Sequence, residues 1–198
     1  IPLIITDVIV KNRNIKINAY VIYSMLLGVI IVLVSLLHPN FHLDDILHVI
    51  VENHDIYVLK SQQGQYIVYR ELKPTWWSIA CNYPLALWSG FFRLGIWEAN
   101  NPLEYMMGVE KLVVLIFSVS AMSRIGNIRK TSNELLIIAA LIYVIILSGF
   151  LAMSAPNFGT LARYSVGYMP ILLLLILINN PLLIFLKSKF ETKVEEIV

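Results

Sequence analysis

Charged side chains in apolar surroundings are the clearest candidates for chemistry in this chain. Glu110 and Lys111 interrupt an apolar run, although a charged group at the centre of a membrane span costs about 2.5–3.5 kcal/mol on insertion scales. Adjacent residues on a helix point about 100° apart, so Glu110 and Lys111 do not face each other. We therefore expect Glu110 to meet a cation elsewhere, and Arg93 and Arg163 are the candidates. The pair would be either a structural ion pair or part of a functional site.

Arg163 has a second property that suits ligand binding. It lies in the segment 155–170, where Pro156 interrupts helix, Asn157 can satisfy freed backbone groups and Tyr164 provides an interfacial ring. A guanidinium donates two parallel hydrogen bonds to phosphate oxygens. The segment therefore predicts either a site for a lipid phosphate or pyrophosphate, with Asn157 and Tyr164 as substrate contacts, or a plain membrane anchor at Arg163.

The histidines do not have the spacing of a metal site. Zinc sites normally need three or four ligands at defined spacing. Only the first two of the four histidines lie within one helical turn of each other, and Pro39 argues against a helix there. The four histidines are His38, His42, His48 and His54. We expect no metal and no cofactor.

The elements that must hold these residues are apolar runs of spanning length. Runs of 17–19 residues are long enough to cross the roughly 30 Å hydrocarbon layer of a bilayer. The composition agrees, because 58% of the residues are hydrophobic and 14% are charged, against about 45–50% and 25% in soluble domains. The net charge of +2 is too small to indicate a nucleic-acid partner. We predict an all-α integral membrane protein with about four transmembrane helices, at residues 19–37, 105–123, 135–153 and 170–186.

The positions of the cations predict the topology. Lys and Arg residues gather before the first run, between the second and third runs and after the fourth, so four crossings place them on one face. The positive-inside rule makes that face cytoplasmic, with both ends of this chain on it. The segments outside the spans are a cytoplasmic N-terminal segment at 1–18, which we interpret as the end of an earlier helix, an extracytoplasmic loop region at 38–104, a cytoplasmic loop at 124–134, an extracytoplasmic loop at 154–169 and a cytoplasmic tail at 187–198.

Three features are predicted inside the loop region. Apolar residues at helical spacing from residue 43 to 50 predict a short amphipathic helix. Residues 56–59 and 66–69 flank a Ser-Gln-Gln-Gly-Gln segment, which predicts a small β-hairpin. The aromatic segment 79–97 is interpreted as interfacial or re-entrant, because counting it as a span would move the cations at 124–130 to the opposite face.

Two stretches also carry a resemblance. They are FFRLGIWEANNPLEYMMGVE at residues 91–110 and NFGTLARY at 157–164. Together they resemble an uncharacterised family of polytopic inner-membrane proteins that is associated with bacterial surface-polysaccharide assembly. Its general layout is similar to that of O-antigen polymerases and other lipid-linked glycosyltransferases. The resemblance covers about residues 83–170 and corresponds to the C-terminal part of a longer protein.

The resemblance implies cell-envelope polysaccharide or glycolipid assembly on a polyprenyl-phosphate-linked substrate in the bacterial inner membrane. In that mechanism Arg93 and Arg163 would hold phosphate oxygens, while Glu98 or Glu110 would orient an arginine or act as a catalytic base. The alternatives are a non-catalytic subunit of an envelope complex, whose outer loop docks protein partners, and a transporter or flippase. The expected partners are membrane lipid, a polyprenyl-phosphate-linked glycan and, for the subunit, other proteins. Catalytic and non-catalytic readings both stay open.

Overall fold

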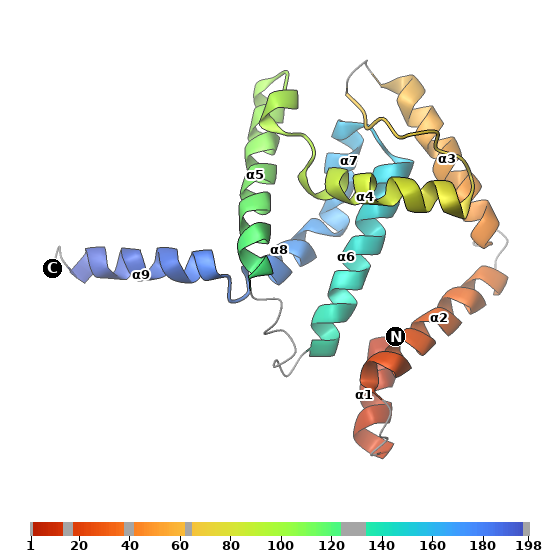
Figure 1. Ribbon diagram of the computed structural model, residues 1–198, viewed down its shortest axis with the longest axis horizontal. Coiled ribbons are helices and arrows are strands. Elements are labelled where there is room, and N and C mark those ends of the chain that lie inside the picture. The colour runs from red at the N-terminus through yellow and green to blue at the C-terminus, as the bar shows by residue number, and fades with distance from the viewer. Residues whose placement is uncertain (1, 14–17, 38–41, 62–64, 124–133, 196–198) are drawn as a thin grey trace.

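The protein is built from helices, which Figure 1 shows in chain order. The computed structural model describes residues 2–13, 18–37, 42–61, 65–123 and 134–195, and within these ranges no β-strand forms. Three of the helices are long and apolar enough to cross a membrane, namely α2 (Ala19–Leu37), α5 (Pro102–Met122) and α6 (Glu134–Ser154). The prediction of an all-α protein is confirmed for the described residues, as is the prediction of helices long and apolar enough to span a membrane. The predicted spans 19–37, 105–123 and 135–153 correspond to these three helices.

The predicted fourth span at 170–186 is wrong as a continuous helix. Helix α8 (Met169–Leu177) ends before Asn179, which has a φ of 53°, and helix α9 (Pro181–Glu195) then begins at a proline. Asparagine tolerates this left-handed conformation at a helix end, and proline fits the first position of a new helix. Figure 1 shows α9 leading away from the other helices. The alternative fourth crossing is a broken one, in which α8 and the preceding residues Phe158–Gly167 meet at 64°.

The predicted β-hairpin is also wrong. Helix α3 (Leu43–Lys60) continues through residues 56–59, because apolar residues at helical spacing recur beyond residue 50. Residues 66–69 lie beside the start of α7 (Phe158–Tyr164) instead, where Tyr66 forms an isolated antiparallel bridge with Asn157. The Ile67 N–H donates to the Pro156 carbonyl at 3.0 Å. This segment therefore pairs with a distant part of the chain.

The aromatic segment forms helix α4 (Trp76–Phe92), followed by the 3-10 turn η2 (Ile96–Glu98). Thr75 caps α4, since its hydroxyl accepts a hydrogen bond from the Ser78 N–H. In Figure 1 α4 crosses α6 rather than running alongside it. Its close approach to α6 depends on small residues, because a Cβ on Gly90 would lie 3.1 Å from the Ser148 carbonyl oxygen. The interfacial or re-entrant placement of this segment stays a prediction.

Two apolar clusters hold the helices together. One joins α3, residues 67–72, α4, α6 and α7, and the other joins α5, α6 and α8. Tyr168 links them, because its ring is fully buried and its hydroxyl donates to the Gly90 carbonyl at 2.5 Å. Helix α1 (Pro2–Arg13) packs mainly against α2, and Figure 1 shows this pair to one side of the other helices. The site described next lies where α4 ends against α5.

Candidate functional site

Arg93 is held in place at the end of α4. Its N–H ends the helix by donating to the Ser89 carbonyl at 3.1 Å, and Leu94 then turns the chain with a φ of 71°. The Arg93 Nε donates to Glu98 Oε1 at 2.9 Å, and their side chains are 27% and 21% exposed. The guanidinium also lies over the Phe158 ring, with its Cζ 5.2 Å from the ring centroid. Contacts from η2 and α7 thus fix the orientation of this cation.

Both carboxylate oxygens of Glu98 accept hydrogen bonds, one of them from Arg93. While its Oε1 accepts from the arginine, its Oε2 accepts from the Gly95 N–H at 3.0 Å. A carboxylate whose two oxygens both accept hydrogen bonds is suited to positioning a neighbour. Of the two roles that the sequence left open for Glu98, this geometry favours the orienting one.

Lys111 brings a second cation to the same place from α5. It is the tenth of the helix's 21 residues, and only 6% of it is exposed. No carboxylate in the described ranges lies within 4.0 Å of its Nζ, because the adjacent Glu110 is on the exposed side of the helix. Gly108 allows the close packing, since a Cβ there would lie 3.0 Å from the Ile96 backbone. The turn η2 therefore sits directly on α5 and brings the Arg93–Glu98 pair to Lys111.

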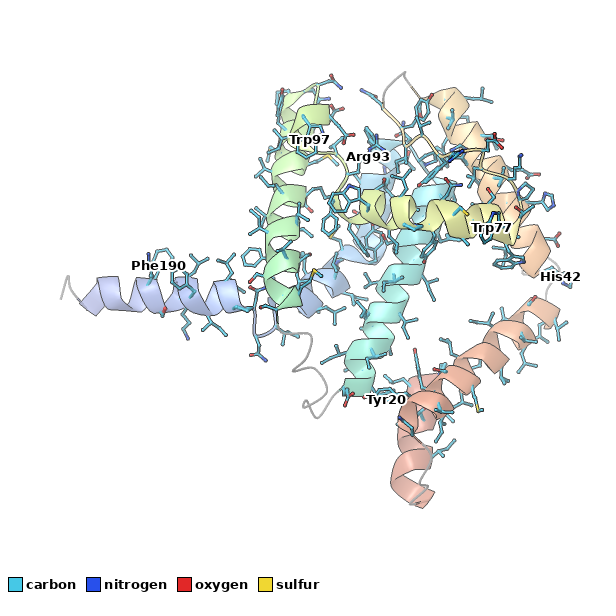
Figure 2. All side chains as sticks on the ribbon, viewed as in Figure 1. Tyr20, His42, Trp77, Arg93, Trp97 and Phe190 are labelled. Atoms are coloured by element: carbon cyan, nitrogen blue, oxygen red, sulfur yellow. The ribbon has the colours of Figure 1, made fainter. Side chains whose placement is uncertain are left out.

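Arg93 and Lys111 both line a cavity of about 230 Å³ between α4, η2 and α5, which we call the Arg93–Lys111 cavity. Glu98 contributes the carboxylate of its wall, and the rest is largely apolar. Figure 2 shows Arg93 and Trp97 near the end of α5 that begins at Pro102. The other lining residues are Leu85, Trp88, Phe92, Gly95, Ile96, Trp97, Gly108, Leu112 and Leu115.

A second, much smaller cavity lies against the same two cations. It holds about 10 Å³, close to the space that one water molecule needs, and Ser89 and Ser165 help to line it. Ser89 is fully buried, and its Oγ has no hydrogen-bond partner in the described part of the chain. A buried hydroxyl without a partner carries a desolvation cost of about 1–3 kcal/mol. This hydroxyl is therefore a hydrogen-bonding group without a partner beside Arg93 and Lys111.

The charges of the site do not balance. Arg93 and Lys111 contribute two positive charges, and Glu98 contributes one negative charge. Glu98 is already engaged with Arg93, so the cavity wall offers Lys111 no carboxylate of its own, and a cation in a largely apolar region is costly. The arrangement can bind an anionic group while its apolar walls contact a hydrocarbon.

The other predicted site residues lie outside this cavity. Glu110 is exposed and makes no ion pair with Arg93 or Arg163. Arg163 is exposed in the last turn of α7. The Tyr164 hydroxyl lies 3.2 Å from that of Tyr57, and this hydrogen bond raises the pKa of Tyr57. The structure therefore does not bring the two predicted arginines together at one anion site.

Asn157 has a structural role in the site's support. Its Oδ1 accepts from the Thr160 N–H at 3.1 Å and so caps α7, while its Nδ2 donates to Ser61 Oγ at 2.8 Å. The cap fixes the start of the helix that presents Phe158 to Arg93. Asn157 thus supports the cavity indirectly, by holding Phe158 against Arg93.

Sequence reasoning singled out Lys111 without assigning it to the anion site, and it missed the aromatic wall of the cavity. Lys111 carried a signal, because it is ionisable in an apolar run, but the sequence did not show which of Glu110 and Lys111 faces inward. Trp88 and Trp97 gave no signal beyond an aromatic-rich segment. Among the described residues no group of three or more His, Cys, Asp or Glu side chains could hold a metal ion, and His38 lies outside them.

Comparison with known proteins does not assign a function, so the proposal below rests on the geometry of the site and on the sequence resemblance. The chain matches no protein-family model, no curated protein and no solved structure.

Proposed function

We propose that this integral membrane protein binds the phosphate group of a lipid-linked substrate between Arg93 and Lys111. The observation that carries the proposal is the burial of Lys111 in the middle of a candidate span with no carboxylate within 4.0 Å in the described ranges. Ionisable groups inside spans are costly and mark ligand or ion sites. The partner that Lys111 lacks would be the ligand.

The walls of the cavity favour a lipid over a small soluble anion. Apolar side chains from α4 and α5 surround the two cations, and Trp88 and Trp97 provide rings of the kind that lie at membrane interfaces. A phosphate would meet the fixed guanidinium of Arg93 on one side and the ammonium of Lys111 on the other. Its hydrocarbon chain would meet the apolar wall.

The resemblance supplies the class of lipid. Its first stretch contains Arg93 and ends at Glu110, next to Lys111, and its second contains Phe158. The two stretches meet where Arg93 lies over the Phe158 ring. The proposed substrate is accordingly a polyprenyl-phosphate-linked glycan of cell-envelope polysaccharide or glycolipid assembly in the bacterial inner membrane. In a transfer reaction the two cations would stabilise the negative charge that develops on the departing phosphate.

One observation favours the alternative of a non-catalytic subunit of an envelope complex. Helix α9 extends away from the other helices in Figure 1, and Phe185 and Phe190 on it are exposed. Figure 2 shows the Phe190 side chain projecting from the part of α9 that extends away from the other helices. A subunit would copurify with other proteins in fixed proportion, while a substrate-binding protein would retain lipid.

Native mass spectrometry of the purified protein tests the proposal. Undecaprenyl phosphate is compared with undecaprenol, which has the same chain but no charge, on the wild type and on Lys111→Met. We expect selective binding of the phosphate by the wild type and a loss of at least about tenfold in affinity in the variant, because each 1.4 kcal/mol of lost interaction is tenfold. The matched control is Lys60→Met, which changes an exposed lysine at the end of α3. Equal binding by wild type and Lys111→Met would refute the proposal.

A further inference from the structure

We propose that the hydrocarbon chain of the ligand passes Phe92 and lies in a second cavity between α5, α6 and α8. This inference rests on the proposed function, because the phosphate at Arg93 and Lys111 fixes the other end of the molecule. The second cavity holds about 290 Å³, and we call it the α8 cavity. Leu141 from α6 and Leu172 and Ile176 from α8 form part of its wall.

The two cavities share a lining residue and lie along one face of α5. Phe92, the last residue of α4, lines both of them. On α5, Lys111 and Leu115 line the Arg93–Lys111 cavity, while Ser118 and Met122 line the α8 cavity. Residues three or four apart lie on one face of a helix, so these four form a continuous stripe. From Lys111 to Met122 the stripe is about 16 Å long at 1.5 Å per residue.

The polarity along this stripe matches an amphipathic ligand. All the charged side chains that line either cavity lie in the first, while the α8 cavity has no charged residue among those that line it. The Asn180 amide at its rim is already satisfied, because its Oδ1 accepts from Ser120 Oγ at 2.9 Å and its Nδ2 donates to the Ile176 carbonyl at 2.7 Å. Ser118 Oγ is the exception, since it has no partner within the described chain. Charge complementarity at one end and apolar walls at the other favour a phosphate-bearing hydrocarbon as the occupant.

Photo-cross-linking tests where the chain lies. The probe is dodecyl phosphate with a diazirine at the end of the chain, and the control probe is the uncharged dodecanol with the same diazirine. After irradiation of the full-length protein in detergent, mass spectrometry of its peptides locates the label. We expect the phosphate probe to label the end of α5 near Met122 and the adjoining α8, and we expect this labelling to be lost in Lys111→Met.

A variant that fills the α8 cavity separates this inference from the proposed function. Ala121→Trp places a large ring in the cavity, and Val119→Trp places the same ring on the exposed side of α5. We expect the first to abolish labelling at α8 while native mass spectrometry still detects Lys111-dependent phosphate binding, and the second to change neither. If Ala121→Trp does not fold, Leu141→Trp fills the same cavity from α6.

Two results would overturn the inference. Lys111-dependent binding with the label elsewhere, for example on α2, would contradict the path of the chain and leave the proposed function intact. Equal labelling of the α8 cavity by dodecanol and dodecyl phosphate, unchanged in Lys111→Met, would show that the cavity takes any hydrocarbon and that the phosphate site does not direct it.

Discussion

Replacing Lys111 by methionine should stabilise the ligand-free protein while it removes phosphate binding. Methionine has a similar length and no charge, so it fits the space of the lysine stem without the cost of a buried ammonium. The opposite signs of the two effects make the test sharp. Replacing a residue that is retained for the fold lowers the stability of the protein, whereas replacing one that is retained for a ligand does not.

The magnitude follows from the position of the side chain. Lys111 is 6% exposed at the middle of α5, where insertion scales assign a lysine a cost of about 2.5–3.5 kcal/mol. The cavity beside it reduces the penalty, so we expect a gain of about 2 kcal/mol. For a chain of this size that corresponds to an increase in Tm of about 4–8 °C.

The assay is thermal unfolding in detergent, with and without dodecyl phosphate. Ligand should raise the Tm of the wild type and leave that of Lys111→Met unchanged, because a ligand stabilises only the state that binds it. Lys60→Met, an exposed replacement on α3, should respond to ligand as the wild type does. A lower Tm for ligand-free Lys111→Met would refute the reasoning, since it would show that the lysine has a stabilising partner within the protein.

Three further replacements test the packing around the site. Asn180→Ala removes a buried amide with hydrogen bonds to three elements and should cost about 2–4 kcal/mol in detergent unfolding; an unchanged unfolding curve would contradict its role at the α8–α9 turn. Tyr69→Phe removes a 2.9 Å hydrogen bond to a carbonyl of α6 and should cost about 1 kcal/mol at pH 8. Burial raises the pKa of Tyr69 above its ordinary 10.0, so the native wild type loses stability as the pH rises past that value; melting at pH 8 and 10.5 should show a smaller loss in Tyr69→Phe, and equal losses would contradict this assignment. Gly90→Ala brings a Cβ against Ser148 and should cost about 1–3 kcal/mol, whereas Gly28→Ala meets nothing within 4 Å; equal melting of these two variants would rule out the close α4–α6 packing.

Long apolar runs could be read from the sequence because their length and composition determine their structure almost independently of the rest of the chain. Helix α2 coincides with the predicted run 19–37, and α5 and α6 differ from their predicted limits by a few residues. Capping explains the shift at α5, since Asn101 accepts from the Glu104 N–H and Pro102 begins the helix before the apolar run does. Spans of this kind need no tertiary information.

The break in the fourth run had a local sequence signal, which the apolar composition of residues 170–186 outweighed in the prediction. Asn179, Asn180 and Pro181 follow one another, and such a sequence favours the end of one helix and the start of the next. For the hairpin only the first predicted strand carried a local signal against it, because the helical spacing of apolar residues continues beyond residue 50. In the second predicted strand, Tyr66 and Ile67 pair with Asn157 and Pro156, some ninety residues away, and a local turn pattern cannot indicate such a partner.

The candidate site combines a local contact with a distant one, and this division decides what the sequence could show. Arg93 and Glu98 are five residues apart and meet across one turn, so their pair is nearly a local structure. Lys111 joins them because Gly108 allows η2 to pack on α5, and that packing also turns Glu110 outward. Glu98 bonds to Arg93 and makes no ion pair with Lys111, so the local pair leaves Lys111 without a bonded carboxylate in the cavity wall. The anion binding that we propose therefore depends on the long-range packing of α5. Substitutions that loosen this packing should weaken phosphate binding even when Arg93 and Lys111 are both retained.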